Sequence, residues 1–512
     1  MSYQIRLLRC TTPNPQLLGA TFCGSSGTLL YKYKTSGQAQ LFSRANIRAL
    51  TRLAIAAVQL DSPLADATMI EEKDIHDVII VGGSLSGLLS GVLFKRRGYN
   101  VTILEKYHSD IRKSQAAGIG LTEQVVKLFH SAGISVNDVG PSMEQVHFYD
   151  SVNGKLEIKR VEPYQGVMTG WTILFYRLRA HFDHFITPVC PQRPPDASEY
   201  PDEGEGVYKT QAKVTSIEYL KFEKVVLVHY DDLSTNTSHT LQTRLLIGAD
   251  GGNSTIRKLL LPSRPVSRKY AGYMAWRGTI PRNQLSALGK ELYQPGVAPI
   301  IANPDVKAYT MTYLIPADDG RFGLDETLVN FVWYDHCPAN SPRYAKSMTD
   351  VDGQMHRWTL PPGKMDPDAW EAQLDVARKT LPPPLDEMVQ KISDCPFISV
   401  VSDFIAPECV FHDGHVVLLG ESFCMARPHS GRATNEVARQ ALHLVDAVEG
   451  KITWTQYRAE IRNCVTLNFY YSRMFGLWTL GGRFAQLWAG LQYWWVGFRI
   501  RLSERLFGKV IP

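Results

Sequence analysis

A short apolar segment that runs into a glycine-rich turn constrains the fold of this chain more than any other feature. Residues 78–81 are Val-Ile-Ile-Val, and residues 82–87 are Gly-Gly-Ser-Leu-Ser-Gly. Apolar residues then recur at helical spacing until Gly98, and a second apolar segment follows at residues 101–104. Apolar segments of this length, rich in β-branched residues, are typical of buried parallel strands. The order therefore predicts a strand, a tight turn, a helix and a second strand, which together make one β-α-β unit.

The turn of this unit has the chemistry of a dinucleotide-binding site. Backbone without side chains can approach a pyrophosphate, whose negative charge is met by the free N–H groups and the positive end of the helix that begins there. Glu105 ends the second strand, where its carboxylate can accept hydrogen bonds from a ribose hydroxyl. A glycine-rich turn in an unrelated α/β protein is the alternative, because a serine stands where the usual fingerprint has its second glycine. The turn positions predicted to bind the dinucleotide are Gly82, Gly83, Ser84 and Gly87.

Later segments predict the rest of an α/β fold. Short alternating segments between residues 214 and 246 predict strands. Aromatic-rich segments between residues 270 and 335 suit an antiparallel sheet with one covered face, which is the candidate substrate layer. Residues 416–420 predict another buried strand, and a helical pattern runs from about residue 434 to residue 448.

Composition and charge exclude several classes of protein. The chain has 512 residues, 44% of them hydrophobic and 21% charged, which is typical of a large globular protein. Its net charge of +5 is too small to indicate a nucleic-acid partner. The eight cysteines include no Cys-x-x-Cys pair, which predicts a reduced protein of cytoplasmic type without a zinc site. His181 and His184 have no third ligand nearby in the sequence, so we expect no metal.

The first 68 residues have a composition of their own. No acidic residue precedes Asp61, whereas arginine, lysine, serine and threonine all occur before it. Two interpretations stay open: a poorly ordered extension or upstream start, and an organelle transit segment that would make the protein mitochondrial.

An aromatic stripe marks the C-terminal end. From Phe484 to Leu502, large apolar residues recur at helical spacing, which predicts one helix with a wide apolar face. The apolar segment is too short to span a bilayer. Three partners for this face are open: the rest of the domain, a second subunit, and a membrane surface anchored by Arg499, Arg501 and Arg505.

Three motifs follow one another along the chain: Val-Gly-Gly-Ser-Leu-Ser-Gly at 81–87, Gly-Ala-Asp-Gly at 248–251 and Leu-Gly-Glu-Ser at 419–422. Their order resembles the single-component FAD-dependent aromatic hydroxylases, in the branch of dihydroxypyridine and salicylate monooxygenases. The resemblance covers about residues 75–450. It implies a Rossmann-like FAD-binding domain interleaved with an antiparallel-sheet substrate domain, followed by C-terminal helices.

The resemblance also implies which residues bind the cofactor. The first motif would hold the FAD pyrophosphate and Glu105 the adenosine ribose. The later positions are Asp250 and Gly251 beside the cofactor and the region that NAD(P)H visits, Arg257 near the pyrophosphate, Gly420 and Glu421 at the ribityl chain, and Ala433 near the flavin ring. Glu421 and Ala433 depart from the family, which has aspartate and glycine there.

The implied activity is that of an FAD-dependent monooxygenase, which uses NAD(P)H and O2 to hydroxylate a phenolic or heteroaromatic small molecule. Epoxidation, Baeyer–Villiger oxygen insertion and flavin binding without turnover are the alternatives, the last because of the two departures. Catalytic residues are not identified from the sequence. The candidates for substrate contact are Tyr273, Trp276, Arg277 and Tyr313, with His429 on the flavin side; of these, Arg277, Tyr313 and His429 are the catalytic candidates. A structural role is the alternative for each, because aromatic residues on such strands commonly fill the core.

We therefore expect six parts along the chain. They are a leader at 1–68, the first part of the FAD-binding domain at 69–186, a loop insertion and strands at 187–264, the substrate domain at 265–402, the closing part of the FAD-binding domain at 403–450, and a helical tail at 451–512.

Overall fold

The computed structural model describes residues 75–108, 117–152, 155–190, 200, 202–303, 306–361, 363–392 and 397–507, together with three short strands that precede them. The chain divides into two units, Met1–Glu71 and Glu72–Pro512. In the first unit, β1 (Ile5–Arg6), β2 (Gly19–Phe22) and β3 (Leu29–Tyr31) form an antiparallel sheet. Apart from these strands, the leader predicted at residues 1–68 lies outside the described residues.

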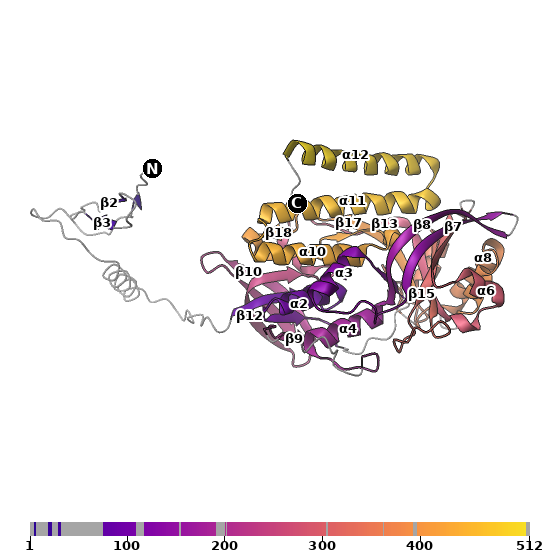
Figure 1. The fold of residues 1–512 in the computed structure, drawn as a ribbon, viewed down its shortest axis with the longest axis horizontal. Helices are drawn as coiled ribbons and strands as arrows, with labels where there is room; N and C mark the ends of the chain where they lie inside the picture. The colour runs from indigo at the N-terminus through magenta and orange to yellow at the C-terminus, as the bar shows by residue number, and fades with distance from the viewer. Residues whose placement is uncertain are drawn as a thin grey trace, which may run out of the picture. The chain divides into compact units, whose positions relative to one another are not determined.

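The second unit contains two large sheets (Figure 1). In the first sheet, β9, β5, β4, β12 and β19 run parallel, and β10 and β11 extend it as an antiparallel hairpin beside β12. Its strands are β4 (Ile75–Val81), β5 (Val101–Leu104), β9 (Gly206–Lys209), β10 (Ala212–Leu220), β11 (Val225–Asp232), β12 (Thr237–Gly248), β18 (Val410–Phe411) and β19 (Val416–Leu418). The predicted β-α-β unit is confirmed, with helix α2 (Leu85–Arg96) between β4 and β5.

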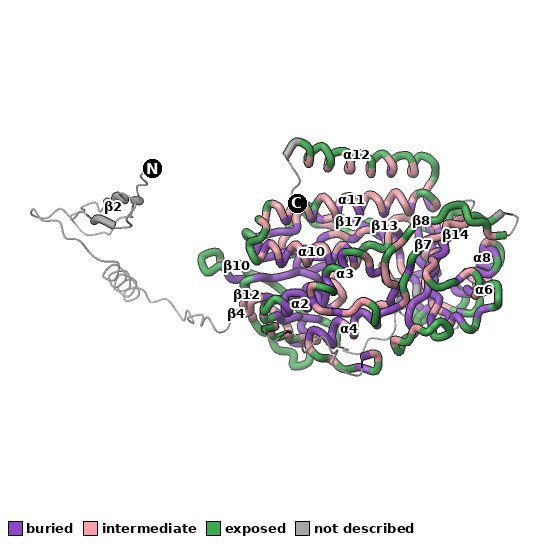
Figure 2. The backbone as a smooth tube through the Cα atoms, in the orientation of Figure 1, coloured by how far each residue is buried: buried purple, intermediate pink, exposed green. Residues whose placement is uncertain are grey.

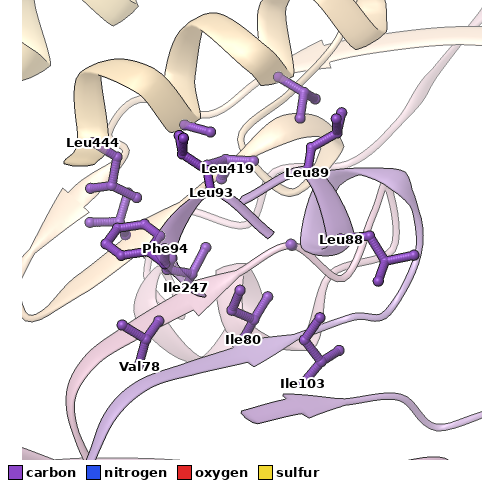
Figure 3. Close-up of a cluster of buried hydrophobic side chains, with 14 of the residues drawn as sticks. Val78, Ile80, Leu88, Leu89, Leu93, Phe94, Ile103, Ile247, Leu419 and Leu444 are labelled. Atoms are coloured by element: carbon purple, nitrogen blue, oxygen red, sulfur yellow. The ribbon is translucent and has the colours of Figure 1, made fainter. Parts of the chain in front are cut away.

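The core of the first sheet forms where its strands meet α2 and α10 (Ala433–Val448). Figure 3 shows Ile80 of β4 and Ile247 of β12 in one cluster with Leu93 of α2 and Leu444 of α10. These side chains are completely buried. Residues 78–81 of β4 are buried in this closely packed core. The glycine-rich turn therefore follows directly from a rigid strand end.

The second sheet has nine strands in the order β20-β17-β13-β16-β15-β14-β7-β8-β6. They are β6 (Gly118–Leu121), β7 (Ser142–Val152), β8 (Lys155–Gly170), β13 (Lys269–Pro281), β14 (Gly296–Asn303), β15 (Ala308–Ile315), β16 (Leu328–His336), β17 (Phe397–Ile405) and β20 (Cys424–Met425). Side chains alternate between its faces. On β13, Tyr273 and Ala275 pack with residues of α11 (Trp454–Leu480), whereas Met274 and Trp276 pack with α8 (Pro367–Thr380).

Two features of the second sheet differ from the sequence prediction. The sheet is mixed, because β14 runs parallel to β7. In addition, β6, β7 and β8 join this sheet, although residues 69–186 were predicted to belong to the FAD-binding domain. An alternating segment shows that a strand has two different faces, but it does not identify the strand's partners. Most of the predicted loop after residue 187 lies outside the described residues.

The tail consists of two long helices. A capping box of Thr453 and Gln456 begins α11, and α12 (Arg483–Phe507) lies along it on the outer side of the second unit (Figure 1). None of the described helices is long and apolar enough to span a membrane. The remaining α-helices are α3 (Glu123–Ser131), α4 (Trp171–Asp183), α5 (Thr255–Leu260), α6 (Ala287–Leu292), α7 (Pro342–Met348) and α9 (Leu385–Gln390).

Candidate functional site

A cavity of about 720 Å³ lies where parallel strands of the first sheet end near the second sheet. It is lined by the turns after β4, β12 and β19, the last of which forms a short 3-10 helix at Gly420–Ser422. Arg277 of β13 and residues 399–402 of β17 contribute to its wall. Ligands of open α/β sheets bind at the carboxyl ends of the strands, so the cavity has the position of a binding site.

The turn after β4 is built from glycines that cannot be replaced without a shift of backbone. Gly82 has a φ of +104°, and a Cβ placed on it would lie 2.5 Å from the carbonyl oxygen of Ala249. A Cβ on Gly87 would lie 2.0 Å from the carbonyl oxygen of Gly82. Gly82 and Ser84 line the cavity, whereas Gly83 and Gly87 are not among the lining residues. Among the described residues, no side chain caps the start of α2, so its first N–H groups stay available for an anion.

Glu105 lines the cavity at the end of β5. Its Oε2 atom accepts a hydrogen bond of 2.9 Å from the N–H of Gly83, and its Oε1 atom accepts one of 3.0 Å from the N–H of Tyr107. The carboxylate is therefore held beside the glycine-rich turn by two backbone donors.

Asp250 supports the start of helix α5 at the cavity wall. Its carboxylate accepts hydrogen bonds from the Oγ of Ser254 at 2.5 Å and from the N–H of Thr255 at 2.6 Å. Burial raises the pKa of Asp250, and these hydrogen bonds oppose the rise. Asp250 and Gly251 both line the cavity, and the hydrogen bonds of the Asp250 carboxylate hold the turn in place.

Arg257 is placed differently from the prediction. Its guanidinium donates to the carbonyl oxygens of Ser422 and Gly252, each at 2.7 Å, and the residue is buried. Arg257 is not among the residues that line the cavity. In place of the predicted position near a pyrophosphate, it connects the turn after β12 to the turn after β19.

The turn after β19 brings Gly420 and Glu421 to the cavity. Gly420 has a φ of +65°, and a Cβ there would lie 2.5 Å from the Oγ of Ser86. The side chain of Glu421 has accessible surface, but that surface faces a cavity with protein on its other sides. This desolvation raises the pKa of Glu421, and the charges of Arg268 and Arg277 counteract the rise only in part.

Helix α10 begins at the cavity with Ala433, whose methyl group is exposed to the open space. No side chain caps this helix within the described part of the chain. Its positive end is therefore open toward a ligand with negative charge.

Two arginines lie on the wall next to the second sheet. The Nε of Arg268 donates to the Oγ of Ser402 at 3.0 Å, and its guanidinium lies 4.1 Å from the ring centre of Trp358. The Nε of Arg277 is buried and has no hydrogen-bond partner among the described residues. Arg277 also lines the cavity, so its guanidinium can meet an acceptor that is bound there.

Comparisons with known proteins agree with this geometry. A family model described as an FAD binding domain matches residues 76–165, and one described as FAD binding domain-like matches residues 270–403. The chain is 24% identical to the 2,6-dihydroxypyridine 3-monooxygenase of Paenarthrobacter nicotinovorans, over 69% of this chain and 78% of that protein. It is 27% identical to the 6-hydroxynicotinate 3-monooxygenase of Bordetella bronchiseptica, over 40% of this chain and 48% of that protein.

The fold matches as well. The structure of the 2,6-dihydroxypyridine-3-hydroxylase from Arthrobacter nicotinovorans superposes with a TM-score of 0.63 at 20% identity, covering 80% of this chain and 93% of that chain. The chain is thus similar, in sequence and in fold, to FAD-dependent aromatic hydroxylases. It is an FAD-dependent monooxygenase, as the order of the three motifs predicts.

The cavity of this monooxygenase fits FAD. Glycines without room for a Cβ line two of the turns, and two helices, α2 and α10, begin there without a side-chain cap among the described residues. A diphosphate needs close backbone approach and N–H donors, and both are present.

Only one of the predicted substrate-contact residues, Arg277, lines the cavity. Trp276 is buried between β13 and α8. Tyr313 and Tyr273 are buried, and the Tyr273 hydroxyl lies 2.6 Å from the Nε2 of His429. His429 also bonds the hydroxyl of Tyr309, and burial holds the pKa of His429 well below its ordinary value. Tyr273, Tyr309 and His429 therefore form a packed cluster beside α11. Tyr313 belongs to a separate core cluster, and none of these aromatic residues lines the cavity.

Sequence reasoning missed several residues of the cavity wall. Arg268, Thr359 and Ser402 lie far apart in the sequence and carry no local pattern, so only the second sheet brings them together. Gln440 accepts the N–H of Gly420 at 2.9 Å. Its position on the inner face of α10 is the one signal that could have identified it.

Proposed function

We propose that this monooxygenase uses NAD(P)H and O2 to hydroxylate a small heteroaromatic or phenolic molecule. One observation carries the proposal: a single cavity runs from turns that fit a dinucleotide to a wall with Arg268 and Arg277. A ring bound at this wall would therefore lie in the same cavity as the cofactor. The names of the relatives, a dihydroxypyridine and a hydroxynicotinate monooxygenase, support this class of substrate.

We assign cofactor roles to the residues of the wall. Gly82 and Ser84 would hold the pyrophosphate with the N–H groups of α2, and Glu105 would bind the adenosine ribose. Glu421 would accept a hydrogen bond from the ribityl chain, and the positive end of α10 at Ala433 would stabilise negative charge on the reduced ring. Bound FAD supplies the redox chemistry by which O2 is reduced and one of its oxygen atoms is delivered to the substrate.

The two arginines favour a substrate that carries a negative charge. Arg277 lines the cavity, where a ring oxygen or carboxylate could accept a charge-assisted hydrogen bond from its guanidinium. A nearby cation lowers the pKa of a ring hydroxyl, and each unit of that shift is worth about 1.4 kcal/mol. The deprotonated ring is richer in electrons, which favours attack by an electrophilic oxygen. Arg277 therefore serves both to bind the ring and to prepare it.

Hydroxylation is better supported than the alternatives. The similar proteins named above are monooxygenases and a hydroxylase of aromatic rings, which does not favour epoxidation, Baeyer–Villiger insertion or flavin binding without turnover. Glu421 faces the cavity and can reach a ligand despite its extra methylene.

The test is turnover with a defined panel of substrates. The protein reconstituted with FAD is mixed with NADH or NADPH and a set of hydroxypyridines, hydroxybenzoates and uncharged phenols, and NAD(P)H oxidation and product mass are followed. We expect substrate-stimulated oxidation with gain of one oxygen atom, strongest for anionic rings. If NAD(P)H oxidation is not stimulated by any ring, or yields only hydrogen peroxide, the proposal is wrong.

Two further expectations concern partners and location. The C-terminal helix presents an apolar face for a membrane surface or a second copy of the chain. A cytoplasmic location stays a prediction, supported by the scattered spacing of the cysteines.

A further inference from the structure

Helix α12 turns its large apolar side chains away from the protein. Figure 2 shows exposed residues along the side of α12 that faces away from α11. The stripe predicted from the sequence is this exposed side, so its packing against the domain is contradicted. Its members are exposed by 39–81%: Phe484, Leu487, Trp488, Leu491, Trp494, Trp495, Phe498 and Leu502.

The opposite side of α12, which packs on α11, is made of smaller or more polar residues. Tyr493 contacts Tyr471 with ring centres 5.7 Å apart, and Gly497 lies close to Leu467. The side chain of Gln486 donates to the carbonyl oxygen of Trp478 at 2.9 Å. A helix that packs for the hydrophobic effect in water buries its widest apolar face, and α12 does the reverse. Exposure of these apolar side chains to water is unfavourable, and a partner that covered them would remove that unfavourable free energy.

The charges of α12 select the partner. Its four arginines are Arg483 at the start and Arg499, Arg501 and Arg505 near the end, and its one acidic residue is Glu504. If two copies paired through this face, arginines would meet arginines whether the helices ran parallel or antiparallel. An anionic lipid surface, by contrast, is complementary to both ends of the helix.

The aromatic residues fit the same partner. Tryptophan prefers the boundary between lipid tails and head groups, because its ring is apolar and its N–H is polar. Trp494 and Trp495 both stack on Phe498, with ring centres 5.5 Å and 5.8 Å apart, and form a compact apolar wedge. Trp478, at the end of α11, is 75% exposed and adds a further tryptophan near the connection to α12.

We propose that α12 is a membrane-surface anchor, which lies in the plane of the bilayer and binds anionic phospholipid through its aromatic stripe and its arginines. No described helix can span a bilayer, so the contact is with one leaflet. The proposal is independent of the substrate of the monooxygenase.

The test is vesicle co-sedimentation with the full-length protein loaded with FAD. Vesicles consist of phosphatidylcholine alone, or of phosphatidylcholine and phosphatidylserine in equal parts. We expect the protein to pellet with the mixed vesicles and to bind them more weakly at high salt, because salt screens the arginines. The double variant Trp494→Ser/Trp495→Ser should bind the mixed vesicles at least about tenfold more weakly than the unaltered protein, because it loses the centre of the stripe.

The matched control is Phe222→Ser, which removes an aromatic side chain that is 96% exposed in the turn between β10 and β11. It should bind vesicles as the unaltered protein does. FAD content and the visible spectrum show whether each variant is folded. Arg499→Gln with Arg501→Gln should weaken binding to mixed vesicles without changing binding to phosphatidylcholine alone.

Three results would overturn the proposal. The first is failure of the unaltered protein to pellet with mixed vesicles. The second is equal binding of the tryptophan variant and the unaltered protein. The third is a dimer in solution that the tryptophan variant dissociates, combined with no vesicle binding, which would assign the stripe to a second copy of the chain.

Discussion

Replacement of Gly82 by alanine should remove FAD binding at a cost that the structure allows us to work out. Alanine at a φ of +104° costs about 1–2 kcal/mol, because Cβ approaches the neighbouring carbonyl in left-handed conformations. The new methyl group would also lie 2.5 Å from the carbonyl oxygen of Ala249 and 2.7 Å from the Cα of Asp250. Both are backbone atoms at the end of β12, so no side-chain rotation relieves the contact. Overpacking of this kind costs about 1–3 kcal/mol more, which gives about 2–5 kcal/mol in total.

The relief of this contact must separate the end of β4 from the end of β12, and these two strands carry the first two motifs. We therefore expect Gly82→Ala to lower the apparent Tm and to purify without FAD. The assays are flavin content, FAD affinity by quenching of flavin fluorescence, and thermal unfolding.

The matched control is Gly450→Ala. Gly450 has a φ of +73° but no atom within 4 Å of an added Cβ, so alanine there costs only the backbone share, about 1–2 kcal/mol. If Gly82→Ala retains FAD and unfolds at the same temperature as Gly450→Ala, the steric reasoning about the turn is wrong.

Three further predictions concern side chains at or near the cavity. Arg277→Met should raise KM for an anionic substrate roughly tenfold to a hundredfold with unchanged FAD content, because a charged hydrogen bond is worth about 1.5–3 kcal/mol. Arg277→Lys keeps the charge and should raise KM less. Steady-state kinetics would contradict this reasoning if uncharged and anionic rings were affected equally. Arg257→Met should destabilise the protein by about 2–4 kcal/mol, because two buried carbonyl oxygens lose their donor; chemical unfolding measures it, and an unchanged midpoint would refute the connecting role. Burial holds the pKa of His429 well below its ordinary value, so the unfolded chain takes up a proton below about pH 6.5 that the folded protein excludes. Neutral His429 therefore stabilises the folded protein above that pH, and this contribution to the free energy of unfolding is lost as the pH falls. His429→Asn should reduce the decline of the apparent Tm on acidification. An equally steep decline in the variant would argue against a buried neutral imidazole.

The β-α-β unit at residues 75–105 was predictable because its evidence is local. Apolar residues at period two or at helical spacing, a glycine-rich turn and a terminal carboxylate all lie within thirty or so residues, and short-range sterics decide them. The order of the three motifs was equally visible. The structure adds the reason for the glycines: a Cβ on Gly82 would meet the backbone of Ala249, and a Cβ on Gly420 would meet the side chain of Ser86 in α2.

The substrate wall was only partly predictable. Arg277 follows Trp276 on β13, so alternation along the strand directs the two side chains to different surroundings, one to the cavity and one to the core. The sequence shows this alternation but does not say which face meets the cofactor. Tyr313 and His429 were candidates because of their chemistry, yet both are buried away from the cavity. Arg268 had no signal, because its neighbour Ser402 lies on β17, distant in the sequence.

By itself, then, the sequence determined the periodic elements, the motifs and their chemistry, because these depend on residues close together along the chain. Tertiary structure alone decided which side chains meet across elements. It turned Arg257 inward to two backbone carbonyls, joined β6, β7 and β8 to the second sheet, and left the aromatic stripe of α12 facing outward. The periodicity of α12 predicts an apolar face, but only the packing of α11 against the small residues behind it leaves that face for a partner other than the protein.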